Sequence, residues 1–161
     1  METKTLQKAT FAAGCFWHVE DAFRRIKGVT DARVGYTGGF VENPGYRLVC
    51  TDTTGHAEAL EVTFDPNVVS YEDLVEFFWT MHDPTQVNRQ GPDHGKQYRT
   101  AIFVHDADQR ETAEKSKQRL GETGKYSKPI ATEIADAGDF WEAEDYHQQY
   151  YAKRGINSCS I

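Results

Sequence analysis

The chain has 161 residues and a formal net charge of −7, with 25 acidic side chains against 18 basic ones. That length fits one domain with a sizeable core, and the acidic balance argues against binding to nucleic acid or to an anionic membrane. No stretch approaches the roughly 20 apolar residues of a membrane span, and the polar N-terminus lacks the apolar centre of a signal peptide. Three cysteines are too few and too scattered for a disulfide framework. We therefore expect a monomeric, single-domain protein (1–161) in the cytoplasm.

The spacing of apolar residues divides the chain into short strands and helices. Ser70, followed by Asp73 three residues later, has the pattern of a capping box and predicts the start of a helix. Residues 83–96 contain two prolines and two glycines without periodicity, and a loop of this length in a compact domain is usually functional. In chain order, the predicted elements are a strand at 10–13, a helix at 16–26, strands at 29–36 and 57–64, a helix at 70–81, a strand at 98–104, a helix at 106–120, a strand at 128–134 and a helix at 142–154.

The order of these elements predicts the fold class. The first six follow the split βαβ, or ferredoxin-like, order of strand, helix, strand, strand, helix and strand. An α+β fold follows, a two-layer sandwich with a mixed sheet and its helices mainly on one face. The last residues, 155–161, are small and polar and contain Cys159, and we expect them to form a mobile tail.

A cysteine follows the first predicted turn. Gly14 allows the backbone to turn tightly between strand and helix, which places Cys15 in the first helical turn. Unpaired amides and the positive end of the helix dipole favour a thiolate there. Cys15 is thus a candidate nucleophile, and the alternative is a small apolar residue buried between aromatic side chains.

Acidic residues alternate with apolar ones along the predicted strand 57–64. If Glu61 faces solvent, Glu58 points to the apolar side together with Leu60 and Val62. A carboxylate is costly there unless it is paired or protonated, so the pKa of Glu58 should rise, as a general acid requires. The alternative is an edge residue whose side chain bends out to water.

Further polar candidates lie in loops and at the start of a strand. Asp93, His94, Gln97 and Tyr98 end the long loop, and Tyr46 follows a Pro-Gly pair. Loop residues held by a rigid strand are common in active sites. The alternatives are a surface turn with a structural tyrosine after it, and a packed anchor at Tyr46.

Metal binding is an alternative role for the cysteines and histidines, in place of a reactive thiol. Cys15 and His18 are three residues apart, but the chain has no Cys-x-x-Cys or His-x₃₋₅-His pair of the kind that zinc sites use. We therefore expect neither a metal ion nor another cofactor.

Five segments, in order along the whole chain, resemble the A-type peptide methionine sulfoxide reductases. They are 14–17 (Gly-Cys-Phe-Trp) followed by Glu20, 36–39 (Tyr-Thr-Gly-Gly), 55–59 (Gly-His-Ala-Glu-Ala), 95–99 (Gly-Lys-Gln-Tyr-Arg) and 143–150 (Ala-Glu-Asp-Tyr-His-Gln-Gln-Tyr). The resemblance implies reduction of the S epimer of methionine sulfoxide, free and in proteins. Cys15 would attack the sulfoxide sulfur and become a sulfenic acid, and Glu58 would give the oxygen its proton. The other implied substrate contacts are Phe16 and Trp17 at the methyl group, Tyr46 and Tyr98 at the oxygen, and Asp93 acting through water.

The resemblance also implies how the enzyme is regenerated. Cys159 corresponds to the recycling cysteine near the C-terminus of many family members and would condense with the sulfenic acid to a disulfide. A thioredoxin-like dithiol would then reduce that disulfide. Cys50 is the rival resolving thiol, although its surroundings in sequence favour a structural role. His18 stands where the family usually has glycine, and in its protonated form it would stabilise a thiolate at Cys15.

Two other classes of function use part of the same pattern. A cysteine-based peroxidase would share the reactive thiol and the resolving thiol, but it needs neither two aromatic residues beside the cysteine nor a proton-donating Glu58. A binding module for methionine-containing peptides would show no turnover and would be indifferent to Cys15→Ser.

Overall fold

The computed structural model describes residues 5–154, so the predicted tail with Cys159 lies outside the described residues. The elements are β1 (Gln7–Ala13), α1 (Phe16–Arg24), β2 (Val29–Thr37), α2 (Tyr46–Cys50), β3 (Ala57–Phe64), α3 (Tyr71–Thr80), β4 (Arg89–Gln90), β5 (Asp93–His94), the 3₁₀ turn η1 (Lys96–Tyr98), β6 (Thr100–Val104), α4 (Ala107–Glu122), β7 (Glu133–Asp136), β8 (Trp141–Glu142), the 3₁₀ turn η2 (Asp145–His147) and α5 (Tyr150–Lys153).

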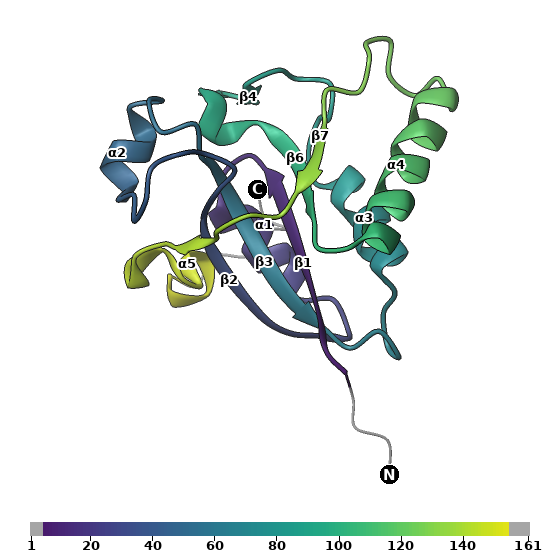
Figure 1. The fold of residues 1–161 in the computed structure, drawn as a ribbon, viewed down its shortest axis with the longest axis horizontal. Helices are drawn as coiled ribbons and strands as arrows, with labels where there is room; N and C mark the ends of the chain where they lie inside the picture. Colours follow the sequence, from purple (N-terminus) through teal and green to yellow (C-terminus); the bar gives the residue numbers. More distant parts are fainter. Residues whose placement is uncertain (1–4, 155–161) are drawn as a thin grey trace.

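One mixed sheet organises the described residues, with the strand order β7-β6-β1-β3-β2-β8 (Figure 1). The central run β6-β1-β3-β2 is antiparallel throughout, and β7 adds a parallel strand at one edge. This order is compatible with the expected split βαβ arrangement. The predicted α+β class, a mixed sheet with helices packed on it, is confirmed.

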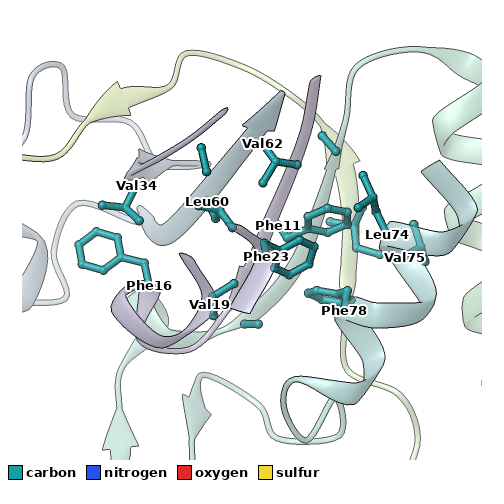
Figure 2. Close-up of a cluster of buried hydrophobic side chains, with 14 of the residues drawn as sticks. Phe11, Phe16, Val19, Phe23, Val34, Leu60, Val62, Leu74, Val75 and Phe78 are labelled. Carbon is teal, nitrogen blue, oxygen red and sulfur yellow. The ribbon is translucent and has the colours of Figure 1, made fainter. Parts of the chain in front are cut away.

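The main core lies between the sheet and the helices α1 and α3. Phe11 of β1 stacks on Phe23 of α1 and on Phe78 of α3, with ring centroids 5.2 and 5.3 Å apart (Figure 2). Leu60 and Val62 of β3 face the same cluster and are fully buried. Burial of side chains this large is the dominant stabilising contribution to a domain of this size.

The second face of the sheet is covered by the chain that follows β7. Alanines of β1, β3 and β6 form a small cluster there with Phe103, and Phe140 packs against it. Glu61 lies on this face and is only 7% exposed, so it does not face solvent, although Glu58 still lies on the apolar side with Leu60 and Val62. Arg33 of β2 donates to its carboxylate at 2.9 Å and Lys8 lies 3.5 Å away, which explains how a charge is accommodated at that position.

Most predicted elements agree with the structure. The strand 57–64 has the predicted bounds, and Ser70 caps α3 with the complete capping box formed with Asp73. The long loop 83–96 contains the short hairpin β4–β5, and the stretch after Gly45 forms the helix α2. The strand expected at 128–134 is displaced to Glu133–Asp136.

The helix predicted over 142–154 is wrong. That segment begins with β8, passes through η2 and ends in the single turn α5, because its polar side chains bond to other elements instead of continuing a helix. The Gln148 side chain accepts from the Val34 amide and donates to the Val34 carbonyl, both at 2.9 Å, and so binds to β2. Gln149 then takes a left-handed backbone conformation, with φ of 53°.

Across residues 5–154, no helix combines the length and the apolar character that a membrane crossing requires.

Candidate active site

Cys15 is the residue that immediately precedes α1. It is the N-cap of that helix, one position before the first turn where the sequence placed it. Gly14 makes this possible because its φ is +92° and because a Cβ there would lie 2.9 Å from Cβ of Gln90 in the hairpin β4–β5. The sulfur therefore lies where β1, α1 and the hairpin meet.

The protonation state of Cys15 differs from the sequence-based expectation. Burial, and next the charge of Glu58, raise the pKa of the Cys15 thiol to about 12. The backbone N–H groups of Trp17 and His18 act in the opposite direction, as a helix start should, but they are outweighed. Cys15 is accordingly a thiol at neutral pH.

Glu58 projects from β3 into the base of the site and is 1% exposed. One carboxyl oxygen accepts from the Phe16 amide at 3.4 Å, and the other has no hydrogen-bond partner among the described residues. Burial raises the pKa of Glu58 to about 8, the Phe16 amide lowers it, and the charge of Asp93 raises it further. The sequence-based expectation of a raised pKa therefore agrees with the structure, and at pH 7 most of the Glu58 carboxyl carries a proton.

Two tyrosines from separate loops lie close to this carboxyl. Tyr46 begins α2 and Tyr98 ends η1. Burial, and next the charge of Glu58, raise the pKa of both phenols, that of Tyr98 to about 12. Both hydroxyls are consequently neutral donors at physiological pH.

An aromatic wall stands beside Cys15. Phe16 is buried against Tyr36, and Trp17 stacks flat on Tyr150, with centroids 3.7 Å apart and planes within 6°. The indole N–H of Trp17 donates to Nδ1 of His147 at 2.9 Å. The ring centroid of His147 also lies 5.2 Å from that of Phe16 and 4.5 Å from that of Tyr46. This fully buried histidine therefore contacts both the aromatic wall and the Tyr46 phenol.

Glu144, the residue before η2, helps to fix the positions of Tyr36 and Tyr46. Its two carboxylate oxygens accept from the Tyr36 hydroxyl and from the Tyr46 amide, each at 3.0 Å. No role was predicted for Glu144, His147 or Tyr150, because residues 142–154 were interpreted as one last helix. The density of aromatic residues in that segment was the signal that could have found them.

Cys50, the rival resolving thiol, lies closer to this cluster than the sequence suggested. It ends α2 and is exposed as a residue, although its thiol is partly covered. This partial burial raises the pKa of the Cys50 thiol, hydrogen bonds with the side chains of Tyr46 and Gln97 lower it, and the charge of Glu58 raises it further. The site thus has two free thiols among the described residues, Cys15 and Cys50.

The structure brings the predicted residues of 5–154 together. Cys15 and Asp93 line one cleft, and the negative charge of Asp93 acts on Cys15, Glu58 and Tyr98. Within the described part of the chain there is no group of three or more His, Cys, Asp or Glu side chains that could hold a metal ion. The arrangement offers a thiol, a protonated carboxyl and two phenols on one side, with aromatic rings on the other.

A thiol at the start of α1 lies beside a buried carboxylic acid of β3, a pairing that suits an oxidoreductase. The sequence model of the peptide methionine sulfoxide reductase family matches residues 7–161, and the chain belongs to that family. It is 57% identical over 156 residues to a peptide methionine sulfoxide reductase MsrA of Methanoculleus marisnigri, covering 97% of this chain and 95% of the relative.

Solved structures agree with this assignment. Reduced Mxr1 from Saccharomyces cerevisiae superposes with a TM-score of 0.89 at 34% identity, over 96% of this chain and 88% of that one. Mxr1 in complex with Trx2 superposes with a TM-score of 0.64 at 25% identity, over 92% and 87% of the two chains.

Proposed function

We propose that the protein reduces the S epimer of methionine sulfoxide, free and in proteins, through a sulfenic acid on Cys15. The observation that carries this proposal is the buried Glu58 carboxyl, protonated at neutral pH, between the Cys15 thiol and two neutral phenols. A sulfoxide is polar at oxygen and apolar at its methyl group. The donors suit the oxygen, and the rings of Phe16 and Trp17 suit the methyl group.

The first step is transfer of oxygen from one sulfur to another. The Cys15 sulfur attacks the sulfoxide sulfur as the thiol gives up its proton, and Glu58 protonates the sulfoxide oxygen. The hydroxyl so formed then moves from the methionine sulfur to the Cys15 sulfur as the bond between the two sulfurs breaks, so that methionine leaves as a thioether and Cys15 becomes a sulfenic acid. The proton lost by the thiol replaces the one that Glu58 has given. Cys15 is oxidised and the substrate sulfur is reduced, so electrons balance.

The protonation states of Cys15 and Glu58 suit this first step. Because Glu58 is mostly protonated at pH 7, its charge no longer opposes ionisation of Cys15. A sulfoxide bound with its oxygen on Glu58, Tyr46 and Tyr98 carries more positive charge on sulfur, which favours a thiolate beside it. Substrate binding therefore supplies the stabilisation of the thiolate that the helix start alone does not.

Separate reduction of the two methionine sulfoxide epimers, with a small dithiol as reductant, tests the proposal. Donors on one side and rings on the other orient a chiral sulfur in one way, so we expect turnover of the S epimer and less than about 1% of that rate for the R epimer. Equal rates for both epimers would contradict the two-sided pocket. Consumption of peroxide with no reduction of either epimer would instead favour a peroxidase.

Regeneration requires a second thiol, and we propose Cys159, which lies outside the described residues. The support is its place in the sequence: it follows α5, which packs on α1 beside Cys15. Its thiol would condense with the sulfenic acid, releasing water and forming a disulfide. A thioredoxin-like dithiol would reduce that disulfide by exchange, and the complex of the similar Mxr1 with Trx2 supports such a partner.

Replacing Cys159 with serine should leave the first turnover intact and stop the recycling by thioredoxin. The reason is that the sulfenic acid still forms but no disulfide follows it. Methionine released per enzyme in the absence and in the presence of thioredoxin measures the two steps. Cys50→Ser is the matched comparison, and the assignment to Cys159 is wrong if only that variant loses recycling.

Substrate and partner also suggest where the protein works. The described cysteines are free, as expected in a reducing compartment, and we propose a cytoplasmic monomer that repairs oxidised methionine.

A further inference from the structure

A cleft opens beside Cys15, and neither the aromatic wall nor the two phenols line it. It is a cleft of about 360 Å³ whose lining includes Cys15, His18, Met81, Pro92, Asp93 and Tyr151. None of the described residues assigned to the sulfoxide itself, other than Cys15 and Asp93, contributes to this lining. Clefts of roughly 300–1,000 Å³ hold ligands larger than one methionine side chain, so the reaction at Cys15 leaves most of this space unused.

One wall of the cleft is fixed by the contact between α1 and α5. His18 of α1 and Tyr151 of α5 pack with ring centroids 6.5 Å apart at 60°. The backbone amide of Gln149 donates to the buried Glu20 carboxylate at 2.6 Å and anchors the start of α5 on α1. Two consecutive tyrosines of α5 thus lie on different sides of α1. Tyr150 stacks on Trp17 of the aromatic wall, and Tyr151 lines the cleft.

The opposite wall is equally preorganised. Met81 ends α3, and Pro92 lies in the hairpin β4–β5. The Gln90 side chain accepts from the Asp83 amide at 2.9 Å and donates to the Asp83 carbonyl at 2.8 Å, which ties the hairpin back to the end of α3. Both walls are therefore formed before any substrate binds. Binding then loses less conformational entropy than it would if a loop had to close over the substrate.

One polar group in this wall is unsatisfied. Nδ1 of His18 is buried without a hydrogen-bond partner among residues 5–154. Burial lowers the pKa of His18, against the charge of Asp21, so the ring is neutral at pH 7 and bonds as a neutral donor or acceptor. Because this atom is buried, a ligand in the cleft meets the uncharged ring of His18 and not Nδ1.

We propose that this cleft is a subsite for an apolar side chain next to methionine sulfoxide in a peptide, with the uncharged ring of His18 as part of its wall. The inference rests on the proposed reaction at Cys15. Met81, Pro92 and the ring of Tyr151 give the cleft its apolar walls, and its continuity with the reacting sulfur places the neighbouring residue there.

The preferred substrates are then methionines oxidised within apolar stretches of chain. Such stretches are buried in folded proteins and become accessible on unfolding. Asp93 at the edge of the cleft adds a negative charge that disfavours acidic neighbours.

Two N-acetylated tripeptide amides test the subsite, both with a central S-methionine sulfoxide, one flanked by leucines and the other by serines. Both are uncharged, so the net charge of the protein does not separate them. We expect kcat/KM of the full chain to favour the leucine peptide by about tenfold, and Tyr151→Ala to reduce this preference to about twofold. His18→Phe keeps a flat ring in the wall of the cleft, so it should retain the preference. Tyr126→Ala, at a tyrosine outside the cleft, is the control and should behave as the wild type.

Two results would overturn the subsite alone. One is a leucine-to-serine ratio near one in a wild-type protein that still reduces N-acetyl-methionine sulfoxide amide. The other is a tenfold ratio that survives Tyr151→Ala, because the preference then comes from elsewhere. Failure to reduce any of the three substrates would instead overturn the proposed function.

Discussion

Replacing Cys15 with serine is expected to abolish methionine sulfoxide reduction, by at least about 10⁴-fold in the first turnover. A serine hydroxyl is a far weaker nucleophile toward sulfur than a thiol and cannot form a sulfenic acid. Methionine released in a single turnover measures the loss. The exchange of sulfur for oxygen is small, and Cys15 is half-buried, so the melting temperature should change little.

The proper comparison for this variant is Cys159→Ser, which lacks a different thiol and should still release one methionine per enzyme. Wild-type single-turnover activity in Cys15→Ser would end the assignment of the nucleophile. It would favour Cys50, the other free thiol among the described residues, which lies beside Tyr46.

Replacing Glu58 with glutamine should slow the reductive step by about 10²–10⁴-fold at pH 7, because an amide has no proton to give to the departing oxygen. The wild-type rate should also decline as the pH rises through about 8, where Glu58 loses its proton. The variant should lack this decline. Single-turnover rates between pH 6 and 10 measure both effects, and an unchanged rate for the variant at pH 7 would remove Glu58 from the mechanism.

The same substitution should raise stability at alkaline pH. Glu58 has its pKa raised above the ordinary 4.5 in the folded state, so its contribution is fully present below pH 4.5 and is lost as the pH rises through about 8. Each unit of pKa shift corresponds to about 1.4 kcal/mol, so the cost of the buried charge is several kcal/mol at pH 9. Glu58→Gln should therefore melt at a higher temperature than the wild type at pH 9, and the difference should shrink toward pH 5.

Glu61→Gln is the matched control on the same strand. Glu61 is paired with Arg33 and Lys8 on the opposite face of β3, so its neutral variant loses ion pairs and should melt at a lower temperature at pH 9. A lower melting temperature for both variants at pH 9 would contradict the unpaired state of the Glu58 carboxyl.

Local signals in the sequence predicted much of the fold. The alternation of 57–64 gave the bounds of β3, and the Ser70–Asp73 pair gave the start of α3, because both depend on residues close together in the chain. The segment 142–154 could not be predicted in this way. Its course depends on bonds to Val34 and Glu20, more than 100 residues earlier, and no periodicity records such partners.

In the site, too, features that depend on nearby residues could be predicted and features that depend on distant residues could not. Turn and strand positions were enough to select Cys15 and Glu58 as candidates. The pKa of Cys15 was not predictable, because a helix start favours the thiolate while burial and the charge of Glu58 oppose it more strongly. Only the folded arrangement shows which influence is larger. His147 was missed for a related reason, since its bond to Trp17 spans 130 residues.

The contact between Gly14 and Gln90 bears on how the sequence can change over evolution. Surface loops normally accept insertions at little cost, because chain closure depends weakly on length. The stretch between Asp83 and Pro92 is an exception, because Gln90 is tied to Asp83 at one end and packs at the other on Gly14, in the turn before Cys15. A single inserted residue would displace Gln90 and with it the backbone that sets the position of the Cys15 sulfur. Length variation in this exposed hairpin is therefore constrained as tightly as residue identity in the core.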